Sequence, residues 1–283
     1  MRIYPNFKTA IENCEKSMVF LSYDVQPDNW QGQQIGERPE AQMKELFNTS
    51  FQIQLGEHLD LDHWRQDIKP NLSWADRHFE EERVSGMPIN PGETWKIWPW
   101  GHNAKRSLML NGKFNHSYAE RMWPKRANHN LKDEEWLKFG KSRITQKFPP
   151  LTGIRYLYAD LNDLVDHLQR NPNTRQAYLP IWFPEDGSHD DRKPCTLGYH
   201  FIQRNGYFHC TYYIRSCDIV RHFRDDLYLT LRLQLWILEK LKELNPDVWE
   251  DVQLGSFVFH CVSLHCFIND WIKLCEGYPD YIG

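Results

Sequence analysis

An Asn-Gly pair at residues 205–206 restricts the fold of this 283-residue sequence more than any other feature. Two stretches rich in aromatic residues flank the pair, TLGYHFIQ at 196–203 and YFHCTYYIRS at 207–216. Because Asn-Gly readily adopts the left-handed backbone of a two-residue turn, the pattern predicts an antiparallel hairpin. A further strand is predicted over GSFVFHCVSLHCF at 255–267.

Helical spacing of apolar residues predicts two helices around this hairpin. The first lies within residues 159–175 and ends at an Asn-Pro pair. The second should be largely buried, and we expect Asp225 and Asp226 to cap its N-terminus. Its apolar face carries Leu227, Leu231, Leu235, Leu238 and Leu241. The order of helix, strands, long helix and strand favours a mixed α/β (α+β) domain over a regular βαβ series.

The first 150 residues differ in composition, being rich in Trp, His, Asn and Pro with weak periodicity. We predict a helix around residues 40–55 and loops over most of the remainder. No internal repeat or low-complexity tract divides the sequence. We therefore expect one domain over 1–283, with a loop-rich half at 1–150 and a more regular half at 151–283.

Charge and cysteine content limit the possible partners and location. A net charge of −4 provides no broad basic surface for a nucleic-acid polymer. The sequence begins without the apolar stretch of a secretory signal, and no apolar run could cross a bilayer, so we expect a cytoplasmic protein that does not bind membranes. Seven cysteines without a CxxC pair indicate free thiols in a reducing compartment.

Cys195, in RKPCTLGYHF at 192–201, is open to three interpretations: a structural residue, a metal ligand or a nucleophile. A nucleophilic cysteine must ionise, which nearby cations favour. Arg175 and the pair Arg215-Ser216 provide guanidinium groups and a hydroxyl that would also suit a phosphate. From these residues alone, a structural cysteine and surface arginines are the more common interpretation.

Two other classes of function can be assembled from the sequence. Histidine and cysteine pairs could bind zinc, but adjacent side chains of a strand point to opposite faces, so we expect no metal site. The pairs are His209-Cys210, His260-Cys261 and His265-Cys266. Twelve tryptophans could form a stacking surface for single strands, but such surfaces normally accompany basic grooves. A nucleotide-binding protein without catalysis stays open.

The segment PCTLGYHFIQRNGYFHCTYYIRSCDIVRHFRDD at 194–226 carries a family resemblance. With NPNTR at 171–175 before it and the predicted strand at 255–267 after it, the segment resembles the thymidylate synthase family, including the pyrimidine hydroxymethylase branch that bacteriophages use for modified DNA. The resemblance implies a large mixed β-sheet flanked by helices, with two such sheets packed back to back in a homodimer. It makes residues 151–283 the catalytic half and, for a viral protein, the host cytoplasm the location.

The resemblance also assigns the residues that hold the nucleotide and the folate. It implies that Cys195 is the nucleophile, and that Arg175, Arg215 and Ser216 bind the 5′-phosphate. Arg175 would come from the partner across the dimer interface. Asp218 would orient the folate, and His265 would approach the deoxyribose.

The resemblance is weaker for two further roles. One is the general base that takes up a proton, and the other is a contact to the pyrimidine ring or to the Cys195 thiol. In FEEERVSGMPINPG at 79–92, Glu82 is our candidate for the general base, with Glu81 as the alternative. These acidic residues could instead lie on a solvent-exposed helix face and have no catalytic role. His200 would touch the base or the thiol unless it is a structural residue of its strand. Tyr118 in HSYAERMW at 116–123 is similar to a Tyr-Gly-x-x-Trp segment of the family.

Asp226 stands where thymidylate synthases have the asparagine that contacts uracil. A carboxyl group can accept a hydrogen bond from the cytosine amino group and, when protonated, can donate one to N3. We therefore predict dCMP as the preferred substrate over dUMP, unless Asp226 only caps the following helix.

The resemblance implies 5,10-methylenetetrahydrofolate as the one-carbon donor. Addition of a Cys195 thiolate to C6 would activate C5 of the pyrimidine. The resulting exocyclic methylene would take up water to give 5-hydroxymethyl-dCMP, or hydride to give a methyl product. Because the sequence ends soon after His265, we expect a wetter site and predict water capture, with reductive methylation or a dUMP reaction as alternatives.

Overall fold

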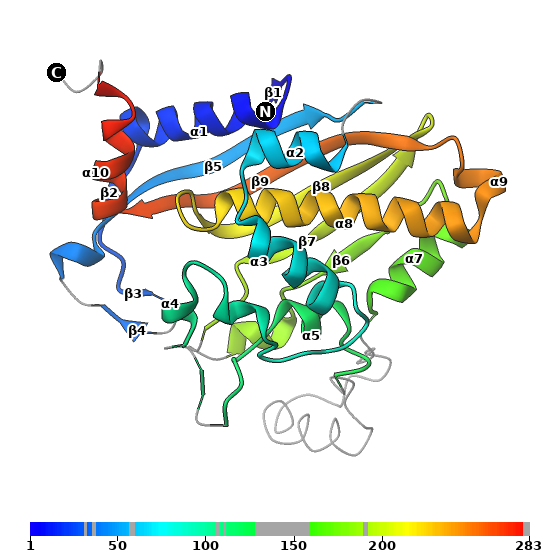
Figure 1. Cartoon of the computed structure of the whole chain (residues 1–283), viewed down its shortest axis with the longest axis horizontal. Coiled ribbons are helices and arrows are strands. Elements are labelled where there is room, and N and C mark those ends of the chain that lie inside the picture. Colours follow the sequence, from blue (N-terminus) through cyan, green and yellow to red (C-terminus); the bar gives the residue numbers. More distant parts are fainter. Residues whose placement is uncertain are drawn as a thin grey trace, which may run out of the picture.

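A seven-stranded mixed β-sheet forms the centre of the molecule, as the computed structural model in Figure 1 shows. The structure describes residues 1–30, 33–35, 38–56, 60–105, 108–109, 111–127, 159–188 and 192–279. Strand order is β1-β5-β9-β8-β7-β6, and β2 also pairs with β5. The strands are β1 (Arg2–Tyr4), β2 (Tyr23–Val25), β5 (Met43–Gln54), β6 (Tyr178–Pro180), β7 (Thr196–Arg204), β8 (Tyr207–Asp218) and β9 (Gln253–Phe267). A separate pair, β3 (Asn29–Trp30) and β4 (Gln33–Gln34), lies apart from this sheet.

The hairpin predicted around the Asn-Gly pair is confirmed as β7 and β8. Asn205 and Gly206 have φ values of 53° and 79°, so both occupy the left-handed region that this turn requires. Strand β9 is confirmed at nearly its predicted bounds and runs parallel to β8. Parallel pairing brings the carboxyl ends of β8 and β9 to the same edge of the sheet.

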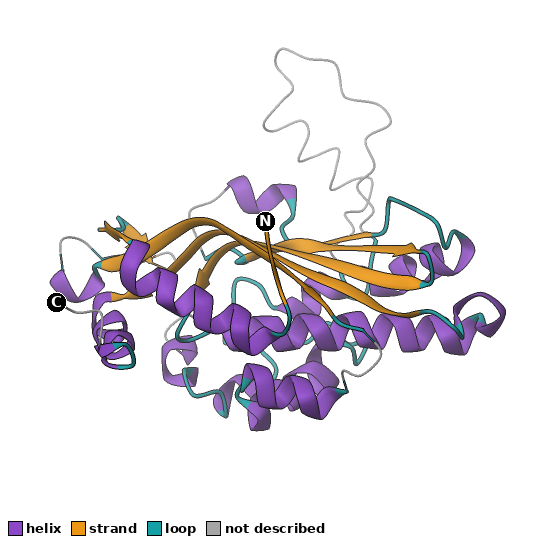
Figure 2. Ribbon diagram, turned by 90° about the horizontal axis from the view of Figure 1, so that it is seen from above, coloured by secondary structure: helices purple, strands orange, loops and turns teal. Residues whose placement is uncertain are grey.

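Long helices cover one face of the sheet (Figure 2). Helix α8 (Phe223–Leu244) contacts β8 and β9, and α1 (Phe7–Leu21) contacts β5. The predicted leucine face of α8 is confirmed, because Leu227, Leu231, Leu238 and Leu241 are buried and Leu235 packs half-buried against the core. The remaining helices are α2 (Leu61–Ile68), α3 (Leu72–Arg77), α4 (Gly101–Lys105), α5 (Tyr118–Met122), α7 (Leu161–Arg170), α9 (Pro246–Trp249) and α10 (Ile268–Glu276), with the short turns η1 (Pro39–Ala41), η2 (His78–Arg83), η3 (Thr94–Lys96) and η4 (Pro184–Ser188).

The predicted cap of α8 is wrong. The helix begins at Phe223 with His222 at its N-cap position, so Asp225 and Asp226 already lie inside its first turns. Asp225 instead accepts hydrogen bonds from the backbone N–H and side-chain amide of Asn71, at 2.8 and 2.9 Å. Because Asp225 holds this neighbouring segment, Asp226 is free for another task.

The predicted helix around residues 40–55 is also wrong, because β5 occupies this segment. Phe51 and Ile53 alternate with polar neighbours and are buried, and β5 pairs with β9 over most of its length. The sequence pattern of this stretch fits either a helix or a strand. It forms a strand because β5 pairs with neighbouring strands on both sides. The first half also contains α1, an amphipathic helix of 15 residues where we expected mostly loops.

Helix α7 is confirmed within residues 159–175, with Asp160 and Asp163 forming a reciprocal capping box. The mixed α/β class is confirmed as well. Among the described residues, no helix is long and apolar enough to cross a membrane. Residues 128–158, where the two predicted halves meet, lie outside the described residues.

Candidate active site

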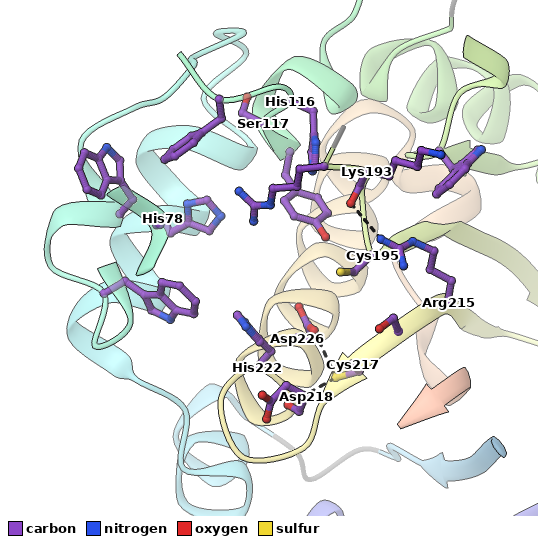
Figure 3. Close-up of a pocket in the computed structure, with 18 of the residues that line it drawn as sticks. His78, His116, Ser117, Lys193, Cys195, Arg215, Cys217, Asp218, His222 and Asp226 are labelled. Carbon is purple, nitrogen blue, oxygen red and sulfur yellow. Dashed lines mark hydrogen bonds between the residues drawn. The ribbon is translucent and has the colours of Figure 1, made fainter. Parts of the chain in front are cut away.

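A pocket of about 540 Å³ opens between one end of the sheet and the irregular segments of residues 74–119 (Figure 3). Seven of the residues predicted from the sequence line this pocket. They are Glu82, Cys195, Arg215, Ser216, Asp218, Asp226 and His265. Residues spread over more than half of the chain therefore converge on one cavity, because β7 and α8 begin there and β8 and β9 end there.

Cys195 differs from every other cysteine of the chain in its exposure. It is half-buried at the start of β7 and lines the pocket, whereas all the others are buried. Its carbonyl oxygen accepts a hydrogen bond from the backbone N–H of Arg215 at 2.9 Å. Burial raises the pKa of the Cys195 thiol and outweighs the opposing effect of Arg215 and Arg192, so this residue is a thiol at neutral pH.

Arg215 holds the segment that presents Cys195. Its Nε donates a hydrogen bond to the Pro194 carbonyl at 2.9 Å, and a terminal nitrogen donates to the Lys193 carbonyl at 3.1 Å (Figure 3). The next residue, Ser216, lies in register with Ser263 of β9 and also lines the pocket. A guanidinium and a hydroxyl are thus placed beside the thiol, a combination that suits an anionic group of a ligand.

Asp226 lies in α8 and faces the same pocket. The Cys217 thiol donates a hydrogen bond to Asp226 Oδ2, with a sulfur–oxygen distance of 3.6 Å. Burial raises the pKa of Asp226 to about 7; Arg83 opposes this shift and Asp225 adds to it. At neutral pH the carboxyl group is therefore protonated in a large fraction of molecules and can both donate and accept hydrogen bonds.

Asp218 and His265 lie opposite each other where β8 and β9 end. The Asp218 carboxylate accepts hydrogen bonds from the backbone N–H groups of Val220 and Arg221, both at 3.0 Å. Burial raises the pKa of Asp218 to about 6 despite these bonds and the Arg221 charge. His265 Nδ1 lies 3.4 Å from the Ser263 carbonyl, and burial lowers the pKa of His265.

The structure separates the two candidates for the general base. Glu81 is exposed and pairs with Arg77, whereas Glu82 is buried and lines the pocket. Glu82 Oε1 accepts hydrogen bonds from the backbone N–H groups of Glu93 and Thr94, both at 2.9 Å. Burial raises the pKa of Glu82, but the hydrogen bonds from His78 and Thr94 outweigh it and bring that pKa below its ordinary value.

Gly92 allows the loop to close over this carboxylate. Its φ is +74°, and a Cβ atom there would lie 2.3 Å from Glu82 Oε1. Only glycine meets both conditions without displacing the carboxylate.

Sequence reasoning missed several residues of the pocket and undervalued Tyr118. The Tyr118 hydroxyl lies 3.1 Å from Thr196 Oγ1, and the Arg83 guanidinium lies 4.5 Å from the Tyr118 ring centre. The missed residues include His78, Arg83, His116, Arg192 and His222. They lie on loops and short turns without periodicity, so no local signal marked them.

Arg175 and His200 do not line this pocket. His200 lies beside Tyr178, on the sheet face opposite to the one that carries the buried side chains of Tyr199 and Phe201. Its Nε2 lies 3.0 Å from the carbonyl oxygen of Arg175, which is exposed. Within one chain, the predicted contact of His200 with the base or thiol is therefore wrong. A role for Arg175 across an interface stays a prediction.

The structure also bears on the metal and tryptophan alternatives. In the part of the chain that it describes, no group of three or more His, Cys, Asp or Glu side chains could hold a metal ion. Four tryptophans line the pocket, namely Trp74, Trp95, Trp98 and Trp182, and the Trp98 ring centre lies 4.9 Å from that of His222. Three others are buried in the core: Trp64, Trp123 and Trp249.

Sequence comparisons agree with the resemblance found in the motifs. A family model described as thymidylate synthase matches residues 90–226. The chain is 28% identical over 116 residues to a thymidylate synthase of Enterobacteria phage T4, covering 40% of this chain and 36% of that protein. It is 24% identical over 171 residues to the thymidylate synthase of Equine herpesvirus 2, covering 60% of this chain and 53% of that protein. The chain thus spans about a third to a half of these relatives.

A solved structure shares the fold over nearly the whole chain. The thermostable thymidylate synthase A from Bacillus subtilis superposes with a TM-score of 0.62 at 14% identity, covering 96% of this chain and 84% of that one. The comparisons define a class by fold, a large mixed sheet flanked by helices. In sequence over residues 90–226 and in fold over nearly the whole chain, this chain is similar to the thymidylate synthases, which supports the predicted resemblance. Its predicted hydroxymethylase branch is not decided by these matches.

Proposed function

We propose that this protein is a transferase that moves a one-carbon unit from 5,10-methylenetetrahydrofolate to C5 of dCMP, giving 5-hydroxymethyl-dCMP. The observation that carries the proposal is the exposure of Cys195 in the pocket that also contains Arg215, Ser216 and Asp226. Because the family match covers residues 90–226, the roles of Glu82 and His265 rest on geometry and resemblance.

The nucleotide binds with its phosphate toward Arg215 and Ser216 and its sugar toward His265. The proposed second contribution to the phosphate site is Arg175 from another copy of the chain. Support for a homodimer comes from the sheet face that carries His200, where Tyr178 is 43% and Val262 52% exposed. A second sheet packed against this face would cover these apolar side chains and bring Arg175 toward the opposite site.

Asp226 is the proposed contact for the base. In its protonated form, one carboxyl oxygen accepts from the cytosine amino group and the hydroxyl donates to N3. The pKa of about 7 makes this form available near neutral pH. Uracil has the opposite arrangement, an N3–H donor and an O4 acceptor, and an ionised carboxylate repels O4.

The folate is a second substrate, for which the pocket has aromatic walls. Trp74 and Trp98 line one side of the pocket, with their ring centres 5.5 Å apart. Asp218 also lines the pocket and provides a carboxylate for the polar edge of the folate ring. When bound, 5,10-methylenetetrahydrofolate supplies the electrophilic carbon. Stacking of a flat ring on these tryptophans would place that carbon above the pyrimidine.

Cys195 begins the covalent chemistry by adding its sulfur to C6. The new C6–S bond makes C5 electron-rich, and C5 forms a bond to the donated carbon. C5 then loses its proton to the Glu82 region, the bond between the donated carbon and the folate nitrogen breaks, and tetrahydrofolate leaves. An exocyclic methylene remains on the base. Water then adds to this methylene, and the C6–S bond breaks to release 5-hydroxymethyl-dCMP and the thiol.

Two measurements on purified protein test the proposal. With dCMP tritiated at C5 and methylenetetrahydrofolate, we expect tritium release that a Cys195→Ala variant lacks. Mass spectrometry should show a gain of CH2O over dCMP. A gain of CH2 would indicate reductive methylation, a reaction only with dUMP would remove the cytosine assignment, and nucleotide binding without tritium release would indicate a binding protein.

A further inference from the structure

His78 occupies a defined position in the pocket, opposite Cys195 in the view of Figure 3. Its ring stacks on Trp74 with centres 4.8 Å apart and planes inclined by 13°. Its Nδ1 lies 2.8 Å from Glu82 Oε2 and 3.1 Å from Thr94 Oγ1. Stacking and hydrogen bonding together leave the imidazole one orientation.

This contact determines which ring nitrogen of His78 carries hydrogen. Because Glu82 is ionised and can only accept, Nδ1 must be the donor, and Nε2 of the neutral ring keeps its lone pair. No hydrogen bond to Nε2 is formed by any residue that the structure describes. Nε2 is therefore a free proton acceptor on a residue that lines the pocket.

The charges around His78 favour the neutral ring that this role requires. Burial lowers the pKa of His78, and the Arg83 cation lowers it further, while Glu82 opposes both effects. Thr94 and Trp74 complete its surroundings without a charge. At neutral pH the ring is uncharged and, backed by a carboxylate, can take up a proton.

Glu82 is held too firmly to leave this arrangement. Two backbone N–H groups bind its other oxygen, and the left-handed Gly92 closes against it. A carboxylate fixed in this way resembles the orienting member of an acid–histidine pair, which stabilises the imidazolium that forms during proton transfer.

We propose that His78, oriented by Glu82, is the general base for the water that captures the exocyclic methylene. This inference rests on the proposed function. The water oxygen forms the new C–O bond while Nε2 takes one of its protons. The π electrons of the methylene move into the ring, and their return forms the C5–C6 double bond and expels Cys195 as thiolate. The proton then leaves His78 for solvent.

The test separates loss of the C5 proton from capture of water. His78→Asn keeps an N–H near the Nδ1 position for Glu82 but removes Nε2. We expect tritium release in a single turnover to stay close to that of the wild type, while 5-hydroxymethyl-dCMP formation falls by about 10²-fold or more. Added 2-mercaptoethanol should then recover the base as a CH2-thioether. His63→Asn, an exposed histidine on α2, is the matched control.

A second variant covers the case in which His78→Asn folds poorly. In His78→Ala, added imidazole should restore product formation, and the restored rate should rise with the basicity of substituted imidazoles. A purely structural role of His78 gives no such dependence.

The outcomes are distinct. Equal losses of tritium release and product in His78→Asn, or an unchanged rate of product formation, would overturn the role of His78 while leaving the transfer reaction standing. A wild-type protein that releases no tritium from dCMP would instead remove the proposed function, and this inference with it.

Discussion

The pocket has two walls that are built in different ways. The sheet wall consists of residues at the ends of β7, β8 and β9: Cys195, Arg215, Ser216, Asp218 and His265. Backbone ladders hold it; the Arg215 N–H bonds to the Cys195 carbonyl, and Asp218 lies in register with His265. Side chains on this wall follow from strand register, which alternating sequence patterns encode.

The loop wall consists of residues on short turns and irregular segments: His78, Glu82, Thr94, His116 and Tyr118. Bonds from side chains to distant backbone groups hold it. Asn90, for example, exchanges hydrogen bonds of 2.8 and 2.9 Å with the backbone of Phe114. The comparison teaches that strand register orders the sheet wall, while the loop wall depends on contacts that no local pattern predicts. In the proposed reaction the sheet wall would supply the nucleophile, and the loop wall would take up and release protons.

The largest expected effect breaks the sheet wall at its nucleophile. Cys195→Ala should lower turnover by on the order of 10⁴-fold or more, because no other exposed thiol can form the bond to C6. Steady-state product formation measures the effect. Cys275→Ala, which alters a buried cysteine of α10, is the control and should keep activity. Equal activity in both variants would remove the covalent mechanism.

The next effect concerns a buried ion pair of α5, the helix that begins with Tyr118 of the loop wall. Arg121 of α5 makes two hydrogen bonds of 2.7 and 2.9 Å to Asp186, and both side chains are buried. Arg121→Met leaves a buried carboxylate unpaired, so the free energy of unfolding should fall by about 3–5 kcal/mol in urea denaturation.

The exposed pair Lys125–Asp163 provides the control for this measurement. Its side chains are 44% and 35% exposed, so Lys125→Met should change the free energy of unfolding by about 0–1 kcal/mol. Similar losses in Arg121→Met and Lys125→Met would show that the buried pair contributes no more to stability than the exposed one.

A smaller effect tests which pyrimidine, cytosine or uracil, the pocket prefers. Asp226→Asn should shift the ratio of kcat/KM values for dCMP and dUMP toward dUMP by about 10- to 100-fold, because the amide can accept from uracil N3–H and donate to O4, whereas an ionised Asp226 carboxylate has no donor for O4 and leaves it unpaired. Competition between the two nucleotides measures the ratio. The exposed Asp247→Asn serves as control, and an unchanged ratio in Asp226→Asn would contradict the role of Asp226.

The smallest effect concerns pH. Asp226 has a raised pKa of about 7, so its carboxyl group carries the donor proton below pH 7 and loses it above. Affinity for dCMP should therefore fall as pH rises above 7, by at most about tenfold per pH unit. Calorimetric titration of dCMP into Cys195→Ala protein measures this without turnover.

The double variant that also carries Asp226→Asn is the reference for this titration. In this reference titration the nucleotide phosphate still ionises, but the protein lacks the Asp226 carboxyl group. Parallel pH profiles in the two proteins would refute the proposed protonation of Asp226.

Part of this architecture was predictable. The hairpin, α7, the leucine face of α8 and the strand β9 follow from turn chemistry and periodicity within each segment. Seven residues singled out from the sequence line one pocket, and five of them come from the segment 194–226; their roles stay predictions. The prediction failed at β5, whose strand form depends on its neighbours in the sheet, and at the predicted cap of α8, because the helix begins at Phe223.

The sequence by itself determined which residues lie on the sheet wall, because strand alternation and turn preference are interactions between near neighbours in the chain. Only the tertiary structure decided that Glu82 rather than Glu81 faces the pocket, that His78 lies against Glu82, and that the pKa of Asp226 rises to about 7. These properties depend on burial and on hydrogen bonds between segments far apart in sequence. Burial and long-range hydrogen bonds of this kind arise only when the chain has folded and its segments have packed together.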